Sequence, residues 1–322
     1  MKNTGQNPYA PVDEEIIGKW MASLDLASGT KETYLSGFKA FCWFVRSTSL
    51  DFDELTRDDI KSFKEYLVDE KKLKPATVSG YLASVRSFYA YSEDNGIENI
   101  AHRVKGVTDS RSFKKESLTP DQARRLLASI DRSTEKGLRD FAILNLMLRT
   151  GLRDIEIVRA NCRDIQTKAG VDVLYVQGKG RASKDNFVVL TPKALSPIAA
   201  YLEKRGKVDK LDPLFASVSS RNAGERLTVR SVSRIAKSAL RAIGIDDERY
   251  TAHSLRHTAI TFSLLGGATE RDAQQMARHA NITTTMLYSH DIDRIKHAAE
   301  REIDNVLDQP DSLVGFSCQQ IS

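Results

Sequence analysis

Residues 171–191 read VDVLYVQGKGRASKDNFVVLT and decide the fold class of the chain. Residues 171–176 and 186–191 are short runs rich in β-branched and aromatic residues, and a polar, basic segment joins them. Two such runs predict a β-hairpin with a long basic tip. The sequence on either side has helical periodicity, so we expect a mainly α fold with a small β-hairpin or sheet.

The segments that flank this hairpin predict a second, C-terminal domain. Before it lies the apolar run FAILNLML (141–148), which predicts a buried helix ending near Gly151. After it, the chain from Pro192 to about Leu307 has a helical pattern. The sequence TPDQ at 119–122 combines a cap residue, a first-turn proline and a glutamine at the third position, which predicts a helix start. We therefore place this domain at 119–305 and a polar C-terminal tail at 306–322.

Residues 13–100 predict a separate domain of four helices. Ile60, Phe63 and Leu67 recur three and four positions apart, the spacing of one helix face, and Pro75 lies where a helix can begin. Residues 101–118 lose this period and gain glycine, serine and basic residues, the composition of a linker.

Composition restricts the class of protein. With 322 residues, 41% of them apolar and 28% charged, the chain fits about two globular domains. No apolar run approaches the length of a membrane span and the N-terminus is polar, so we expect a cytoplasmic protein with no membrane segment. Three widely spaced cysteines exclude a disulfide framework. The net charge of +5 lies C-terminal to residue 115, which permits a polyanionic partner.

Five of the six histidines lie within 45 residues, at positions 253, 257, 279, 290 and 297. His253 and His257 have the i, i+4 spacing of a zinc-binding helix. However, Ser254 stands where such a helix needs its glutamate, and the Arg256 cation lies between the two imidazoles. The Gly178-Lys179 pair also lacks the other residues of a phosphate-binding P-loop. We therefore expect neither a metal nor a cofactor.

Arginine, histidine and tyrosine together suit phosphodiester chemistry, because guanidinium grips phosphate oxygens and imidazole transfers protons near neutral pH. Four segments carry these residues in order: TGLR (150–153), GK (178–179), HSLRHT (253–258) and ARHANITTTMLY (277–288). Their order, and the nine-residue step from His279 to Tyr288, closely resemble the motifs of the tyrosine recombinases, also called the phage integrase family. The resemblance extends over about residues 13–305.

This resemblance implies a helical, SAM-like core-binding domain followed by an α+β catalytic domain. It implies an enzyme that cleaves and rejoins double-stranded DNA without metal or ATP, through a 3′-phosphotyrosine and a Holliday junction. A covalent link of this kind conserves the energy of the cleaved phosphodiester. It also implies a homotetramer on two recombination sites. Enzymes of this family integrate or excise mobile elements or resolve chromosomes or plasmids. The sequence does not identify the target DNA or any accessory proteins.

The resemblance also assigns candidate roles to individual residues. Tyr288 is the expected nucleophile, and Arg153 and Arg256 are expected to grip the non-bridging phosphate oxygens and stabilise the charge that builds on phosphorus. His253 and His279 would add hydrogen bonds, with His253 as the expected proton carrier for the tyrosine. Lys179 at the hairpin tip is the expected general acid, although Arg181 and Lys184 lie nearby and could be mistaken for it. Glu156 is the expected carboxylate that supports the site.

Other residues receive structural interpretations. His257, His290 and His297 are interpreted as structural or surface residues. Arg278 stands where the family usually has glycine, which predicts looser helix packing there or an added DNA contact.

Two alternatives remain. A catalytically silent DNA-binding clamp would need no nucleophile, so the complete residue set argues against it. A type IB topoisomerase-like enzyme would use the same chemistry without a second DNA or a tetramer, and the compact two-domain plan favours recombination. Only about a dozen residues precede the first predicted helix, which favours a simple Xer-like or transposon-type enzyme. Apolar residues at 313, 314 and 316 make the tail a candidate for docking on a neighbouring subunit.

Overall fold

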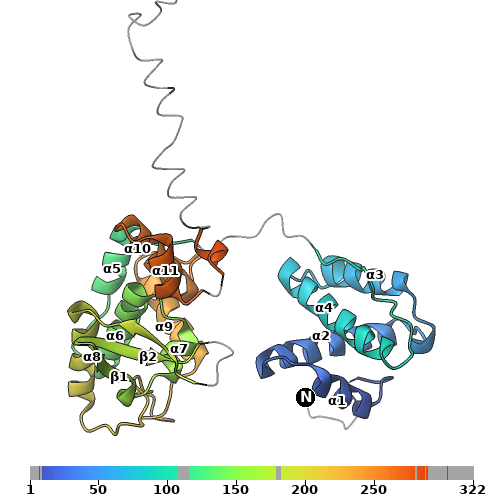
Figure 1. Ribbon diagram of the computed structural model, residues 1–322, viewed down its shortest axis with the longest axis horizontal. Coiled ribbons are helices and arrows are strands. Elements are labelled where there is room, and N and C mark those ends of the chain that lie inside the picture. The colour runs from blue at the N-terminus through green and yellow to red at the C-terminus, as the bar shows by residue number, and fades with distance from the viewer. Residues whose placement is uncertain are drawn as a thin grey trace, which may run out of the picture. The chain divides into compact units, whose positions relative to one another are not determined.

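The computed structural model describes residues 7, 9–107, 116–178, 183–279, 281–286, 288 and 303. The chain divides into two compact units, Met1–Ser112 and Phe113–Ser322 (Figure 1). The limits that we expect for the two domains stay predictions, and the tail at 306–322 lies outside the described residues. No described helix has the length and apolar character needed to cross a membrane.

The first unit is helical. Its helices are α1 (Glu14–Ser23), α2 (Ser28–Ser47), α3 (Arg57–Glu65) and α4 (Pro75–Glu93), with a short 3₁₀ turn (Phe52–Glu54) before α3 and a π turn (Tyr66–Glu70) after it. Aromatic side chains fill the core: the Phe38 ring centroid lies 5.2 Å from that of Trp20 and 4.2 Å from that of Phe88. Helix α4 begins at Pro75, as predicted, because proline suits the first helical turn.

The second unit combines helices α5 to α11 and a short 3₁₀ turn (Cys162–Asp164) with a small sheet. The helices are α5 (Pro120–Ala128), α6 (Glu135–Thr150), α7 (Asp154–Arg159), α8 (Pro192–Arg205), α9 (Val229–Ala242), α10 (Ala252–Leu265) and α11 (Glu270–Ala277). The sheet is antiparallel, in the order β1 (Ile165–Lys168), β2 (Val171–Val176) and β3 (Asn186–Val189). The mainly α fold with a small sheet is therefore confirmed.

The predicted hairpin is β2–β3, in which Val173 pairs with Val189 and Val176 with Asn186. Strand β1 extends this hairpin and is not predicted by the sequence. It has only four residues, three of them exposed, so it lacks the apolar alternation that marks a strand. Its link to β2 is the two-residue turn Ala169-Gly170, where both φ angles are positive, the geometry of tight hairpin turns.

Helix α6 fixes the start of the site. Its residues from Ala142 to Leu148 are all buried in the core. The helix ends at Gly151, whose φ of 62° is left-handed, a conformation that glycine adopts at little cost. The chain then turns sharply, so that Arg153 precedes the short helix α7.

Candidate active site

Arg256 joins three parts of the second unit. It lies on α10 with only 2% of its surface exposed, and its Nη1 and Nη2 donate to the carbonyl oxygens of Gly151 and Ala277. These carbonyls end helices α6 and α11, so one guanidinium holds both helix ends against α10. A guanidinium carries more N–H donors than these two contacts use, which leaves donors for an anion.

Arg153 is oriented by Glu156 one turn further on. The Arg153 backbone N–H donates to Glu156 Oε2 over 2.8 Å, and Arg153 Nη1 lies 3.1 Å from Oε1. The Glu156 side chain is fully buried, whereas a quarter of the Arg153 side chain is exposed. The carboxylate thus caps the start of α7 and aims the guanidinium at the same time.

Arg278 is a second partner of this carboxylate. It ends α11 with a left-handed φ of 54°, and its Nη2 lies 2.7 Å from Glu156 Oε2. Only 8% of its side chain is exposed. The guanidinium is therefore directed onto Glu156 rather than into solvent, and it links the end of α11 to the start of α7. The sequence predicted looser helix packing or a DNA contact at this position.

Positive charge dominates this cluster, since Arg153, Arg256 and Arg278 surround the single carboxylate of Glu156. Burial would raise the pKa of Glu156, but Arg278 and Arg153 outweigh it and hold that pKa below its ordinary value. Burial, together with repulsion from Arg153 and Arg278, lowers the pKa of Arg256 to about 9. An excess of buried cations favours an anion, so the cluster suits a phosphate group.

His279 lies beside this cluster. Its Nδ1 is 2.9 Å from the buried hydroxyl of Thr285. Burial lowers its pKa to about 4, and the nearby cations Arg256, Arg153 and Arg278 act in the same direction. At neutral pH the imidazole is uncharged, so it can offer a hydrogen bond but does not add a further positive charge.

Tyr288 packs its ring beside a small apolar cluster formed by residues of α10 and α11, namely Ile260, Leu264, Ala273 and Ala277. Its hydroxyl forms a hydrogen bond with His257 Nδ1, and the two ring centroids lie 5.1 Å apart. Burial raises the pKa of Tyr288 to about 12, and the Arg256 charge opposes this rise. His253, one turn before His257, is exposed, and its ring centroid lies 4.9 Å from that of His257.

Sequence reasoning missed two residues of this cluster. His257 was interpreted as structural or surface, yet its Nδ1 contacts the Tyr288 hydroxyl. The available signal was its i, i+4 spacing from His253, which places both rings on one face of α10. Arg278 was recognised as a departure from the family pattern, but its contact with Glu156 depends on α7 and α11 meeting in space.

The basic tip of the hairpin is only partly described. Lys179, the predicted general acid, and Arg181 lie outside the described residues, as do His290 and His297. Lys184 binds the Asp164 carboxylate, and its Nζ also donates to the Arg159 carbonyl oxygen over 2.8 Å. Lys184 is thus occupied by a structural ion pair, which argues against Lys184 as the general acid.

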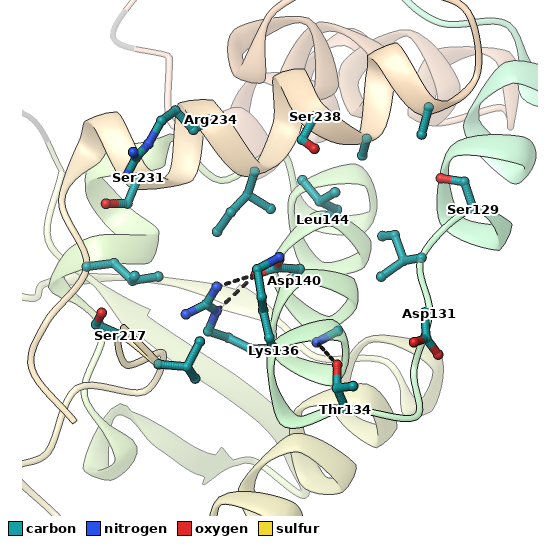
Figure 2. A pocket seen from close by; sticks show the side chains of 18 of the residues that line it. Ser129, Asp131, Thr134, Lys136, Asp140, Leu144, Ser217, Ser231, Arg234 and Ser238 are labelled. Atoms are coloured by element: carbon teal, nitrogen blue, oxygen red, sulfur yellow. Dashed lines mark hydrogen bonds and ion pairs between the residues drawn. The ribbon is translucent and has the colours of Figure 1, made fainter. Parts of the chain in front are cut away.

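The second unit also contains a cavity of about 730 Å³ between α6 and α9. Figure 2 shows Lys136 and Asp140 of α6 and Arg234 and Ser238 of α9 among the residues that line it. Its wall holds the buried ion pair of Arg139 and Asp140, whose Nη2 and Oδ1 atoms are 2.7 Å apart. None of the predicted site residues that the structure describes lines this cavity.

Arg278→Gly should lower the free energy of unfolding by about 2–4 kcal/mol. Breaking a buried ion pair costs about 3–5 kcal/mol, and relief of the left-handed backbone at a non-glycine residue returns about 1 kcal/mol. Urea unfolding monitored by circular dichroism measures the difference. Arg278→Lys, which keeps the charge, is the matched control, and its free energy of unfolding should fall by less. A glycine variant as stable as the unaltered protein would show that the Glu156 contact contributes nothing.

Comparison with known proteins assigns this fold and site to a family. Residues 116–294 match the model of the phage integrase family, and residues 18–98 match that of the phage integrase N-terminal SAM-like domain. Tyrosine recombinase XerD of Listeria innocua is 33% identical over 272 residues, which cover 82% of this chain and 89% of that protein. Tyrosine recombinase XerC of Caldanaerobacter subterraneus is 27% identical over 312 residues, which cover 88% of this chain and 83% of that protein.

Solved structures show the same fold. The XerH site-specific recombinase bound to palindromic difH substrate, a post-cleavage complex, superimposes with a TM-score of 0.69 and 19% identity over 90% of each chain. A lambda integrase (75–356) dimer bound to a COC′ core site gives a TM-score of 0.65 and 18% identity, covering 84% of this chain and 96% of that one. By its two family matches and its curated relatives, this chain belongs to the phage integrase family of tyrosine recombinases.

Proposed function

We propose that this protein is a site-specific recombinase that cleaves and rejoins double-stranded DNA through a covalent link to Tyr288. The observation that carries the proposal is the convergence of Arg153 and Arg256 with His279 at the junction of α6, α7, α10 and α11, beside Tyr288. The relatives named tyrosine recombinases, and the DNA complexes among the structures of the same fold, support it.

In the proposed reaction, the two arginines bind the non-bridging oxygens of the scissile phosphate and stabilise the negative charge that grows during attack. The Tyr288 hydroxyl gives up its proton to a neighbouring histidine as its oxygen forms a bond to phosphorus, while the bond from phosphorus to the 5′ oxygen breaks. The 5′ oxygen leaves as a hydroxyl after it receives a proton, for which we propose Lys179. His253 and neutral His279 donate hydrogen bonds to the phosphate. The 3′-phosphotyrosine conserves the bond energy, so rejoining requires neither ATP nor a metal.

We further propose that four copies assemble on two recombination sites and exchange strands through a Holliday junction. The helical first unit and the catalytic unit would contact duplex DNA together. Because its proposed substrate is DNA, we place the protein in the cytoplasm. Integration, excision and dimer resolution share this chemistry, so the DNA site decides among them.

Strand exchange tests this function. Two duplexes from the DNA flanking the gene, one of them labelled, are incubated with the protein, and recombinant strands and Holliday junctions are separated by electrophoresis. We expect both products. Relaxation of a supercoiled plasmid without any exchange would favour the topoisomerase-like alternative, and tight binding without cleavage would favour the silent clamp.

Deletion of residues 308–322 should weaken assembly on DNA without preventing binding of one copy. The tail combines apolar residues with polar surroundings, a composition suited to docking on a neighbouring subunit. Sedimentation of the protein with a duplex carrying its site measures the complexes, and we expect smaller species after deletion. Tetramers of undiminished stability in the truncated protein would exclude this role.

A further inference from the structure

The contact between Tyr288 and His257 joins a proton donor to a proton acceptor. The tyrosine hydroxyl carries the proton that must leave when its oxygen attacks phosphorus. Among the described residues, the hydrogen-bond partner that the structure gives this hydroxyl is His257 Nδ1. An imidazole nitrogen that lacks a proton is an acceptor, and imidazole is the side chain best suited to take up a proton near neutral pH.

The surroundings of Tyr288 make such an acceptor necessary. Burial raises the pKa of its hydroxyl to about 12, so only about one molecule in 10⁵ is ionised at pH 7. A nucleophile that is almost entirely protonated needs a base in contact with it during the attack. General base catalysis of this kind contributes about 10²–10⁴-fold to a rate.

The other candidate bases fit the position less well. The family resemblance predicts His253 as the proton carrier, but the structure gives the contact with the hydroxyl to His257, and the His253 ring contacts the His257 ring. His279 uses its Nδ1 on Thr285, and burial together with three arginines lowers its pKa to about 4, which makes it a weak base.

We propose that His257 is the general base of strand cleavage, an inference that rests on the proposed function of Tyr288. His257 Nδ1 takes the proton as the Tyr288 oxygen bonds to phosphorus, while the leaving 5′ oxygen receives its proton from a separate acid. In rejoining, the 5′ hydroxyl attacks phosphorus, the bond between phosphorus and the Tyr288 oxygen breaks, and the protonated Nδ1 returns its proton to that oxygen.

The charged groups around His257 set the useful pH range for a test. Arg256 lies beside it on α10, Arg153 directly precedes α7, and Arg278 directly follows α11; both helices meet α10 at the site. The rings of His253, also on α10, and of Tyr288 both lie against the His257 ring. Because the pKa of Arg256 is about 9, measurements from about pH 6.5 to about pH 8 keep about nine-tenths or more of this guanidinium charged.

The variant that tests the proposal is His257→Asn. Its side-chain oxygen preserves a hydrogen-bond acceptor near the position of Nδ1 but cannot take up a proton. Single-turnover cleavage of a nicked duplex from the DNA flanking the gene should fall by about 10²–10⁴-fold at pH 7. The deficit should shrink about tenfold per pH unit, because the variant depends on the ionised fraction of tyrosine.

Two further variants complete the design. His253→Asn removes a proposed phosphate contact, so its deficit should be independent of pH. His102→Asn changes an exposed histidine of the first unit and should cleave like the unaltered protein. A pH-dependent deficit in His253→Asn, with His257→Asn behaving like the unaltered protein, would overturn the proposal and return the base to His253.

A measurement without DNA tests the contact itself. In ¹⁵N-labelled protein, Tyr288→Phe should shift the Nδ1 resonance of His257 and leave that of His102 unchanged. An unchanged His257 resonance would overturn the proposal. If the unaltered protein forms no adduct, or forms it on another residue, the proposed function and this inference both fail. If the adduct forms on Tyr288 and His257→Asn cleaves at the normal rate at every pH, the inference alone fails.

Discussion

Tyr288→Phe should bind its target duplex as tightly as the unaltered protein and cut neither strand. Phenylalanine preserves the ring that packs beside Ile260 and Leu264, and it lacks only the hydroxyl. Loss of a covalent nucleophile should lower the cleavage rate by about 10⁵–10⁶-fold, the scale found when such a residue is removed from a hydrolase. Folding should change little, because one hydrogen bond contributes about 1 kcal/mol.

Denaturing gels of protein mixed with nicked duplex measure the cleavage, and mobility shifts measure the binding. Tyr175→Phe, which removes a hydroxyl from strand β2, is the matched control and should form adducts at the normal rate. An adduct that persists in Tyr288→Phe would mean that another residue attacks the DNA.

Glu156→Gln should cause the largest loss of stability of any single substitution in the site. The amide preserves the shape and still accepts the Arg153 backbone N–H, but it removes the negative charge that Arg153 and Arg278 share. Loss of one partner of a buried ion pair costs about 3–5 kcal/mol. Cleavage should also fall, because the Arg153 guanidinium loses the carboxylate that orients it.

The pH dependence provides a second criterion. The arginines hold the folded-state pKa of Glu156 below its ordinary value. The charge of Glu156 therefore contributes its full stabilisation of the folded state above the ordinary carboxyl pKa of about 4.3, and this stabilisation is lost as the pH falls through the folded-state pKa. Urea unfolding of the two proteins should therefore differ at pH 7 and converge in acid. Glu203→Gln, an exposed carboxylate on α8, should change stability by less than about 0.5 kcal/mol. Equal stability of Glu156→Gln and the unaltered protein at pH 7 would refute the charge argument.

Local signals predicted much of the fold. The cap at Thr119 and the end of α6 near Gly151 depend on neighbouring residues only, and the structure confirms both. The β2–β3 hairpin was visible because both of its strands are rich in β-branched residues. Strand β1 was missed because its pairing with β2, rather than its own composition, makes it a strand.

The site was less predictable than the fold. The resemblance located the motif residues along the chain, and the structure brings Arg153, Arg256 and His279 together from three separate segments. The contacts of Arg278 with Glu156 and of His257 with Tyr288 span 122 and 31 residues of sequence. Such pairs depend on how α7, α10 and α11 pack, which no spacing in one sequence reveals.

The most direct test of the account is to identify the residue and the DNA end in the covalent adduct. The unaltered protein is trapped on a nicked duplex and digested, and the DNA-linked peptide is sequenced by mass spectrometry. The account predicts a 3′-phosphate joined to the oxygen of Tyr288, with a free 5′ hydroxyl on the released strand. A link to any other residue, a 5′-phosphate link, or no adduct on a duplex that the protein recombines would contradict it.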